Sequence, residues 1–299
     1  MRYNYSIIIP HKNSPDLLSR CLKSIPERDD VQVIIVDDNS SPDKVDFQIF
    51  PGLNTKNTIC IFDKSGKGAG HARNVGLEIA EAKWLIFCDC DDFFTSVFSS
   101  ILDENVNSEY ELTYYDIESV FSDTLEPCNR SENYKEKFYK AIEDEDIDLL
   151  RYKMTTPWGK IVLHSFVMEN GFRFDETPVA NDAWFSFLIG HNAKKVNAVK
   201  KSLYVVTENR SSLMHQNSKK NLWCRLEVAA RINDHLILYK KTQYHINLFA
   251  YEYYFIHFGL CVIFKSFAYS VKHTPAKYIF SDLWKCFVTM MIPSKRKLG

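Results

Sequence analysis

Three aspartates stand close together in the segment Asp89-Cys90-Asp91-Asp92, directly after the apolar run 84–88. Carboxylates one residue apart at the end of a strand can share a divalent cation, and hard oxygen ligands suit Mg²⁺ or Mn²⁺. A cation held by so few carboxylates completes its shell with phosphate oxygens and water. The pattern therefore indicates a substrate with a diphosphate leaving group, whose growing charge the cation would neutralise.

Two further polar clusters follow apolar runs. Pro10-His11-Lys12-Asn13 comes after residues 6–9, and Asp37-Asp38-Asn39 comes after residues 31–36. Asp37 or Asp38 could accept a hydrogen bond from the imide of a uracil or from a ribose hydroxyl. Turn-forming Asp and Asn would explain any one cluster, but three polar strand ends together indicate a binding site.

The elements that must position these residues alternate between strand and helix. The apolar runs 6–9, 31–36, 58–62 and 84–88 predict strands that are buried on both faces. Helices are expected from Pro15 and after the glycine-containing loop 65–70. The alternation predicts an α/β fold with a mainly parallel sheet flanked by helices, in which ligands bind beyond the carboxyl ends of the strands.

The second half of the chain is less regular. Residues 105–154 are more acidic, and Glu143-Asp144-Glu145-Asp146 is interpreted as solvated rather than as a metal site, because consecutive carboxylates cannot all face one ion. Strands are expected again at residues 160–163 and 203–206. After Asn221 the pattern is helical to the end.

Composition excludes several classes of protein. The 299 residues include 37 Lys and Arg against 38 Asp and Glu, which argues against a nucleic-acid binder. Ample hydrophobicity excludes disorder. The eight cysteines are scattered, so we expect free thiols in a reducing compartment rather than a disulfide framework. The N-terminus lacks the pattern of a secretory signal, and the expected location is the cytoplasm.

Four segments resemble glycosyltransferase family 2 in sequence, order and spacing. They cover roughly the first hundred residues, and each alone is a weak signal. The segments are 6–13 (SIIIPHKN), 35–40 (IVDDNS), 70–76 (GHARNVG) and 85–92 (LIFCDCDD).

This resemblance implies the GT-A fold, a nucleotide-sugar donor, Mn²⁺ or Mg²⁺ as cofactor, and inversion at the anomeric carbon. UDP is the family's commonest nucleotide, although nothing in the sequence excludes GDP or dTDP. The resemblance implies Asp91 as the direct metal ligand with Asp89 nearer the ribose, and His215 either as a further ligand or as a solvated loop residue. The residues it assigns to the donor are Pro10, His11, Asn13, Asp37, Asp38, Gly70, Arg73, Asp89, Cys90 and Arg210.

The same resemblance extends to the acceptor side. Residues 181–185 (NDAWF) match the region where the family places a Glu-Asp pair whose aspartate is the catalytic base, which nominates Asp182; Asn181 replaces the usual glutamate. Without the resemblance, Asp182 would be read as the N-cap of the following apolar helix. The residues expected near the acceptor are Trp158, Lys160, Asn181 and Trp184.

The expected reaction is a single displacement. A carboxylate removes the proton of the acceptor hydroxyl as that oxygen attacks the sugar. A double displacement would need a nucleophile close to the sugar, and the sequence offers no candidate for one.

The C-terminal stretch 251–269 approaches the length of a membrane span, but Glu252, His257 and Lys265 interrupt it. Two interpretations stay open. Its helices either lie at a membrane surface, aided by the basic residues 295–297, or form an aromatic core with a solvated tail.

The sequence thus predicts a GT-A domain over residues 1–220, with a donor half (1–104) and an acceptor half (105–220), followed by a helical extension over 221–299. The expected function is metal-dependent sugar transfer from a nucleotide sugar to a saccharide or lipid-linked saccharide in surface-polysaccharide, lipopolysaccharide or capsule synthesis. The expected location is cytoplasmic, at the inner face of the cell membrane if the extension binds lipid. The alternative is a non-catalytic nucleotide-sugar-binding or scaffold protein of the same fold. A nucleotidyltransferase is disfavoured, because Lys12 alone does not make the basic glycine-rich loop expected after its first strand.

Overall fold

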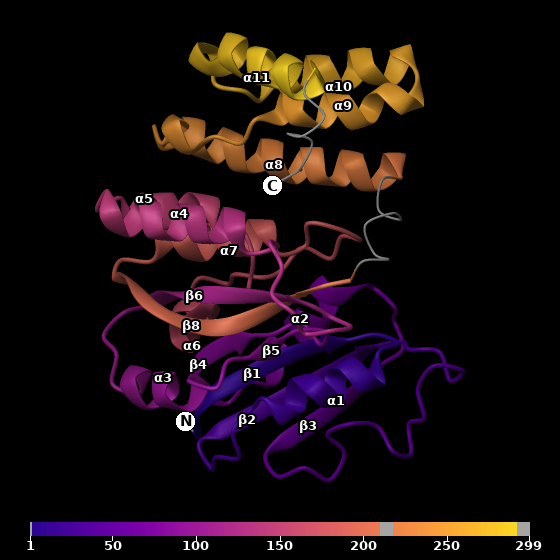
Figure 1. The fold of residues 1–299 in the computed structure, drawn as a ribbon, viewed down its shortest axis with the longest axis vertical. Coiled ribbons are helices and arrows are strands. Elements are labelled where there is room, and N and C mark those ends of the chain that lie inside the picture. Colours follow the sequence, from indigo (N-terminus) through magenta and orange to yellow (C-terminus); the bar gives the residue numbers. More distant parts are fainter. Residues whose placement is uncertain (1, 210–217, 292–299) are drawn as a thin grey trace. The chain divides into compact units, whose positions relative to one another are not determined.

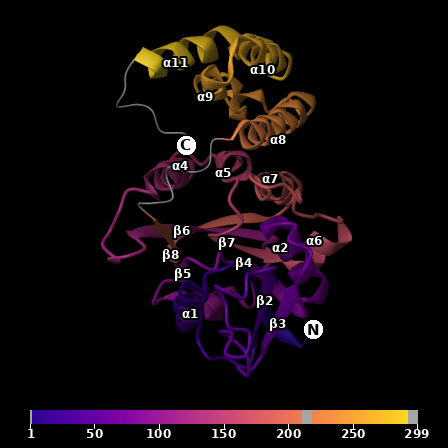
Figure 2. The ribbon, with the colours of Figure 1, turned by 90° about the vertical axis from the view of Figure 1, so that its right-hand side faces the viewer.

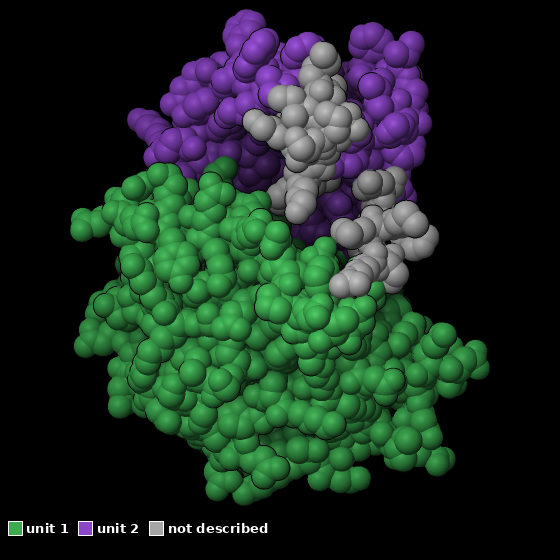
Figure 3. All heavy atoms as spheres, in the orientation of Figure 1, with its two compact units in different colours: residues 1–177, 181–212 green, residues 178–180, 213–299 purple. Residues whose placement is uncertain are grey.

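The structure is a computed structural model that describes residues 2–209 and 218–291. The chain forms two compact units, which Figure 3 draws in green and purple. Unit 1 comprises residues 1–177 and 181–212, and unit 2 comprises residues 178–180 and 213–299.

Unit 1 is built on one eight-stranded sheet with the order β3-β2-β1-β4-β7-β6-β8-β5 (Figure 1). β1, β2, β3 and β4 are parallel to one another, β7 is antiparallel to both of its neighbours, and β8 runs parallel to β6. The predicted α/β fold with a mainly parallel sheet is therefore confirmed. The strands are β1 (Tyr3–His11), β2 (Val31–Asp38), β3 (Thr58–Asp63), β4 (Ala82–Phe87), β5 (Phe93–Phe94), β6 (Leu112–Phe121), β7 (Lys160–Leu163) and β8 (Val196–Glu208).

The register of the parallel strands brings their polar ends to one edge. His11 lies beside Asp37 across β1 and β2, and Ile8 lies beside Phe87 across β1 and β4. β1, β2 and most of β4 are buried on both faces, which is what continuous β-branched and aromatic runs predict.

Helices cover the sheet. α2 packs against β1 and β2, whereas α4, α5 and α7 gather over β6 and β8 (Figure 2). Gly76 permits the close approach of α2, because a Cβ there would lie 2.5 Å from Ile8 Cγ2. The helices of unit 1 are α1 (Pro15–Lys23), α2 (Ala69–Ile79), α3 (Phe98–Asn105), α4 (Glu132–Glu143), α5 (Ile147–Lys153), α6 (His164–Glu169) and α7 (Ala183–Asn192).

The central strand β6 lies in the stretch whose pattern suggested no strand. Its sequence LTYYDIESVF mixes polar and aromatic residues, yet most of it is buried. Asp116 is tolerated there because the Tyr139 hydroxyl donates to its carboxylate at 2.8 Å. The acidic segment 143–146 lies at the end of α4 and in the turn before α5, with its first three residues exposed.

Unit 2 is helical. Short 3₁₀ segments join its helices, and its core centres on Leu222, Leu226, Leu248 and Phe255. Among the described residues no helix is both long and apolar enough to cross a membrane. All eight cysteines of the chain are free thiols, as expected. The helices are α8 (Lys219–Leu238), α9 (Glu252–Phe255), α10 (Leu260–Lys272) and α11 (Ile279–Met291).

Candidate active site

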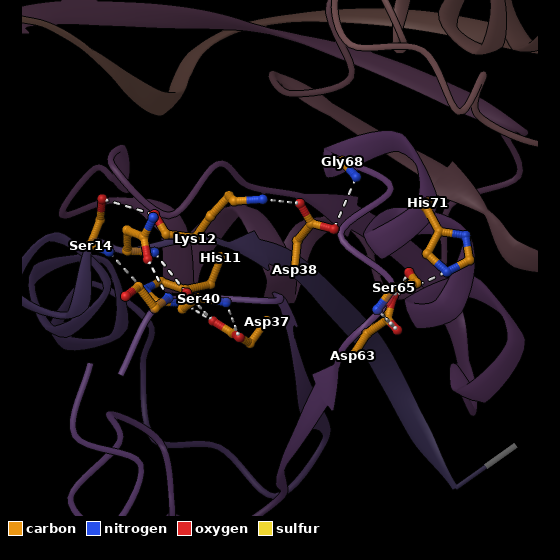
Figure 4. A network of polar contacts seen from close by, with 12 residues as sticks. His11, Lys12, Ser14, Asp37, Asp38, Ser40, Asp63, Ser65, Gly68 and His71 are labelled. Carbon is orange, nitrogen blue, oxygen red and sulfur yellow. Dashed lines mark hydrogen bonds and ion pairs between the residues drawn. The ribbon is translucent and has the colours of Figure 1, made fainter. Parts of the chain in front are cut away.

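The ends of β1 and β2 carry a buried polar network (Figure 4). Ser14 N–H donates to His11 Nε2 at 3.1 Å, so His11 Nδ1 carries the proton and donates it to Asp37 at 2.7 Å. The other partner of Asp37 is Ser40, through both its main-chain N–H and its hydroxyl. His11 and Asp37 are each about 1% exposed. These hydrogen bonds fix the positions of both side chains at this strand end.

Asp38, next in the chain, connects three segments. Its carboxylate accepts from Lys12 Nζ at 3.0 Å and from the main-chain N–H of Gly68 at 2.9 Å, and Figure 4 shows it between those two groups. Asn13 closes the loop on the other side, since its amide oxygen accepts from Ser41 N at 2.8 Å. Pro10 lies within β1, paired in register with Val36. The structure thus brings the donor-side residues of β1 and β2 together.

The Asp89–Asp92 segment follows β4 and is tied to β8. Asp92 is buried and accepts from the Tyr204 hydroxyl at 2.7 Å and from Thr207 N at 2.6 Å. The Tyr204 hydroxyl also accepts from Asp89 N at 3.0 Å. Asp92 is therefore an anchor of the loop, with both carboxylate oxygens occupied.

Asp91 differs from its neighbour. Its main-chain carbonyl accepts from Arg20 at 2.6 Å and from the Thr207 hydroxyl at 2.9 Å, which holds the backbone. The residue is exposed, and within the described part of the chain its carboxylate has no hydrogen-bonded side-chain donor. Partial desolvation and the nearby Asp89 charge raise its pKa. A fixed backbone, a free carboxylate and surplus negative charge suit a divalent cation.

Few protein side chains are available to hold a cation at Asp91. Among the described residues, no three His, Cys, Asp or Glu side chains converge on one position. An ion at Asp91 would therefore depend on oxygens from a bound ligand and from water. His215 and Arg210, the other residues expected to reach the ion or the diphosphate, lie outside the described residues.

Arg73 of α2 connects this loop to the segment that carries the predicted base. Its guanidinium donates to Asp89 at 2.5 Å and to the Asn181 side chain at 2.8 Å, and the residue is 4% exposed. Its ring neighbour is Phe174, with the guanidinium carbon 5.4 Å from the ring centroid. Charged hydrogen bonds at low exposure are strong and geometrically strict.

The first residues of the 70–76 motif contact residues 174–176 and Asn181. A Cβ on Gly70 would lie 2.0 Å from Asp175 O, so only glycine allows this approach. His71 lies between Glu176 at 2.7 Å and Asp63 at 3.1 Å. Asn74 exchanges two hydrogen bonds with the main chain of Phe174, at 2.9 and 3.0 Å. The motif therefore docks the segment that leads to Asp182.

Asp182 stands at the N-cap position of α7, but its side chain makes no capping hydrogen bond. Burial raises its pKa, while Arg73 and Lys160 favour its charged form and Asp89 opposes it. A carboxylate whose pKa is raised is a better proton acceptor. Its alternative role as a side-chain cap finds no support in this geometry.

Lys160 and Trp158, two of the residues predicted near the acceptor, contact other residues of unit 1. The Lys160 ammonium is completely buried and donates to the carbonyl oxygens of Met154, at 2.9 Å, and Thr156. Burial lowers its pKa to about 7. Trp158 stacks on Tyr204, with ring centroids 5.4 Å apart and planes 7° apart.

Trp184 and Cys90 are the remaining predicted site residues that the structure describes. Trp184 stacks on Phe187 one turn along α7, with centroids 5.3 Å apart. Burial raises the pKa of the Cys90 thiol well above its ordinary value.

Sequence reasoning missed several residues that hold the site. Arg20, His71, Tyr204 and Thr207 make the contacts above but stand far along the chain from their partners, Tyr204 being 112 positions from Asp92. Two signals were available: His71 belongs to the 70–76 motif, and Tyr204 belongs to the expected strand 203–206, directly before Thr207.

The same polar strand ends and acidic loop agree with a known family. The family model for glycosyl transferase family 2 matches residues 6–167, more than half of the chain. The chain belongs to glycosyl transferase family 2. The matched residues include both polar strand ends and the Asp89–Asp92 loop.

Solved structures show the fold of this family member. It resembles the crystal structure of S. aureus TarS 1–349 in complex with UDP-GlcNAc, with a TM-score of 0.68 and 18% identity, over 92% of this chain and 82% of that one. The TarS 1–349 complex with UDP gives a TM-score of 0.60 at 20% identity, over 78% and 65% of the two chains. The GT-A fold is confirmed.

This chain matches only part of the length of its curated relatives. A putative glycosyltransferase of Bacillus subtilis, EpsH, is 24% identical over 72% of this chain and 64% of its own. An Escherichia coli protein, UDP-Glc:alpha-D-GlcNAc-diphosphoundecaprenol beta-1,3-glucosyltransferase WfaP, is 33% identical over 30% of this chain and 36% of its own. The chain therefore spans less than two thirds of the length of these relatives.

Proposed function

We propose that this chain transfers a sugar from a nucleoside-diphosphate sugar, with UDP as the nucleotide, to a hydroxyl group of a saccharide or lipid-linked saccharide during surface-glycan synthesis. The observation that carries the proposal is the Arg73 bridge, which ties the acidic loop after β4 to the segment bearing Asp182. Binding of the donor and deprotonation of the acceptor require the carboxylates of this loop and of Asp182 to be held in fixed positions relative to one another. Family membership, the UDP and UDP-GlcNAc complexes of TarS, and the UDP-Glc-dependent relative WfaP support the donor class.

In the proposed reaction Asp182 accepts the proton of the acceptor hydroxyl. The acceptor oxygen forms a bond to the anomeric carbon as the bond from that carbon to the diphosphate oxygen breaks, and the sugar is inverted. The products are the glycoside and the nucleoside diphosphate. The raised pKa of Asp182 favours the proton transfer, while the charge of Arg73 favours the ionised form that accepts the proton.

On the donor side, the buried network of His11, Asp37 and Ser40 supports the loops that would hold base and ribose. Asp91 and Asp89 would hold Mn²⁺ or Mg²⁺ with the diphosphate, and the ion when bound would neutralise leaving-group charge. Arg73 holds Asp89, and Tyr204 and Thr207 hold Asp92, so the loop needs little rearrangement to bind the ligand.

The test separates donor binding from turnover. Wild-type protein is screened with UDP-, GDP- and dTDP-sugars and detergent-solubilised lipid-linked acceptors, and the released nucleoside diphosphate is measured. Asp182→Asn should lower turnover by roughly a hundredfold or more, while UDP affinity measured by calorimetry stays unchanged. Asp144→Asn, an exposed carboxylate on the surface, is the matched control.

Near wild-type turnover by Asp182→Asn would refute its role as the base. A wild-type protein that binds UDP-sugar but releases no diphosphate with any acceptor would instead favour the non-catalytic alternative, a nucleotide-sugar-binding or scaffold protein.

A further inference from the structure

α10 buries two serines and exposes two phenylalanines, while its Tyr269 packs against the core of unit 2. Its buried stripe is Val262, Ser266 and Ser270. The two serine hydroxyls donate to the buried carboxylate of Glu252, at 2.5 and 3.1 Å. Phe264, on the opposite side, is 71% exposed. A helix surrounded by water has the reverse arrangement, with its apolar stripe inward.

α11 repeats this inverted arrangement. Asp282 and Cys286 point inward, and Asp282 accepts from His245 Nε2 at 2.6 Å. Phe280 is 86% exposed and Trp284 is 66% exposed. Two helices of one unit therefore satisfy polar groups inside and present large apolar side chains outside, which indicates an apolar environment around them.

Both helices lie on the side of unit 2 that faces away from α8 (Figures 1 and 2). In each helix, three exposed apolar residues follow one another at the helical spacing i, i+4, i+7. We call the exposed apolar residues of these two helices the aromatic face: Leu260, Phe264 and Phe267 of α10, and Phe280, Trp284 and Phe287 of α11.

The exposed formal charges of α10, of α11 and of the segment between them are all positive. Residues 256–291 contain four lysines, Lys265, Lys272, Lys277 and Lys285, all of them exposed. Their one acidic residue, Asp282, is buried. The chain as a whole has a net charge of −1, so this positive surplus is local. A second copy of the chain would bring lysines against lysines, whereas anionic lipid headgroups supply the opposite charge.

From the inverted helices and their basic surroundings we infer that the aromatic face of α10 and α11 docks on the surface of an anionic lipid bilayer. Each helix has 13 residues, about 20 Å, which is too short to cross the hydrocarbon core of roughly 30 Å. The helices lie in the interface, with phenylalanine and tryptophan among the acyl chains and lysines at the headgroups. This inference does not depend on the proposed sugar transfer.

Flotation of the full chain with vesicles tests the inference. Binding is expected to vesicles of equal parts phosphatidylcholine and phosphatidylglycerol, and to be much weaker with phosphatidylcholine alone or in high salt. The triple variant Phe264→Ser, Phe280→Ser, Trp284→Ser should lose roughly tenfold or more of the partition coefficient. Ile49→Ser is the matched control, because Ile49 is 78% exposed in a loop of unit 1.

A second measurement does not depend on the triple variant. Lipids brominated near the headgroup should quench the tryptophan fluorescence of wild-type protein, and Trp284→Phe should remove most of that quenching. Circular dichroism and the thermal midpoint verify that variants are folded. Absence of wild-type binding to either vesicle, or equal binding by wild type and a folded triple variant, would overturn the inference. So would concentration-dependent dimers that the triple variant abolishes, since a second copy would then cover the face.

Discussion

Arg73 and Asp89 form an ion pair in which the arginine is buried and the aspartate is partly exposed, with guanidinium nitrogen and carboxylate oxygen 2.5 Å apart. The same guanidinium donates to Asn181, which is 108 positions further along the chain and adjacent to Asp182. One side chain thereby sets the relation between the acidic loop after β4 and the segment before α7. The Arg73 bridge therefore ends on the neutral amide of Asn181, and the next residue in the chain is the carboxylate Asp182.

Arg73→Lys should lower turnover by roughly a hundredfold, because an ammonium cannot hold Asp89 and Asn181 in the fixed planar geometry of a guanidinium. Steady-state release of nucleoside diphosphate measures the effect. Arg173→Lys, which alters a surface pair with Glu78, should have little effect. Equal activities of the two variants would show that the bridge is unimportant for the reaction.

Asp91→Asn should weaken binding of Mn²⁺ in the presence of UDP and lower turnover, because an amide oxygen carries no charge to hold the ion. Wild-type activity should disappear in EDTA and return with Mn²⁺ or Mg²⁺. Calorimetric titration of Mn²⁺ into the protein with UDP measures the affinity. Full wild-type activity in the chelator would contradict the metal role of Asp89 and Asp91.

Tyr204→Phe should lower the free energy of unfolding by about 2 kcal/mol, because it leaves the buried Asp92 carboxylate and the Asp89 N–H without their hydroxyl partner. The loop it releases carries Asp91, so Mn²⁺ affinity should fall as well. Urea unfolding and metal titration measure the two effects. Tyr110→Phe, at an exposed tyrosine, is the control. A destabilised variant with unchanged metal affinity would mean that Tyr204 supports the fold alone.

Lys160→Met should change how stability depends on pH. Burial lowers the pKa of Lys160 from 10.5 to about 7 in the folded protein. Between these values the unfolded chain binds more protons than the folded one, so wild-type stability gains up to about 1.4 kcal/mol per pH unit from this group as pH rises above 7.

The variant lacks this contribution, so the stability difference between wild type and Lys160→Met should shift in favour of wild type between pH 7 and pH 9. Urea unfolding at several pH values measures it, and Lys140→Met, at an exposed lysine, provides the baseline. A difference that does not vary with pH would show that Lys160 stays charged in the folded state.

Local sequence determined much of the donor half. Two continuous apolar runs are buried on both faces of the sheet, and such runs of β-branched residues predict strands from composition alone. They are Ile7-Ile8-Ile9 and Val33-Ile34-Ile35-Val36. The polar residues directly after them were then expected at one sheet edge, and the register confirms this. The strand β6 was missed because its buried polar groups are satisfied by partners that no local pattern reveals.

Tertiary structure alone decided how the site is held and which way the last helices face. The 70–76 motif was recognisable, but its docking of Phe174 and Asn181 depends on contacts across about a hundred positions. The C-terminal stretch was compatible with an aromatic core or with a membrane surface, because helical spacing shows that side chains share a face without showing which face is buried. The structure divides the stretch: Phe255 lies in the core of unit 2 and Tyr269 packs against that core, whereas Phe264 is exposed. The buried Glu252 and Asp282 need hydrogen-bond donors inside the unit, and Ser266, Ser270 and His245 supply them.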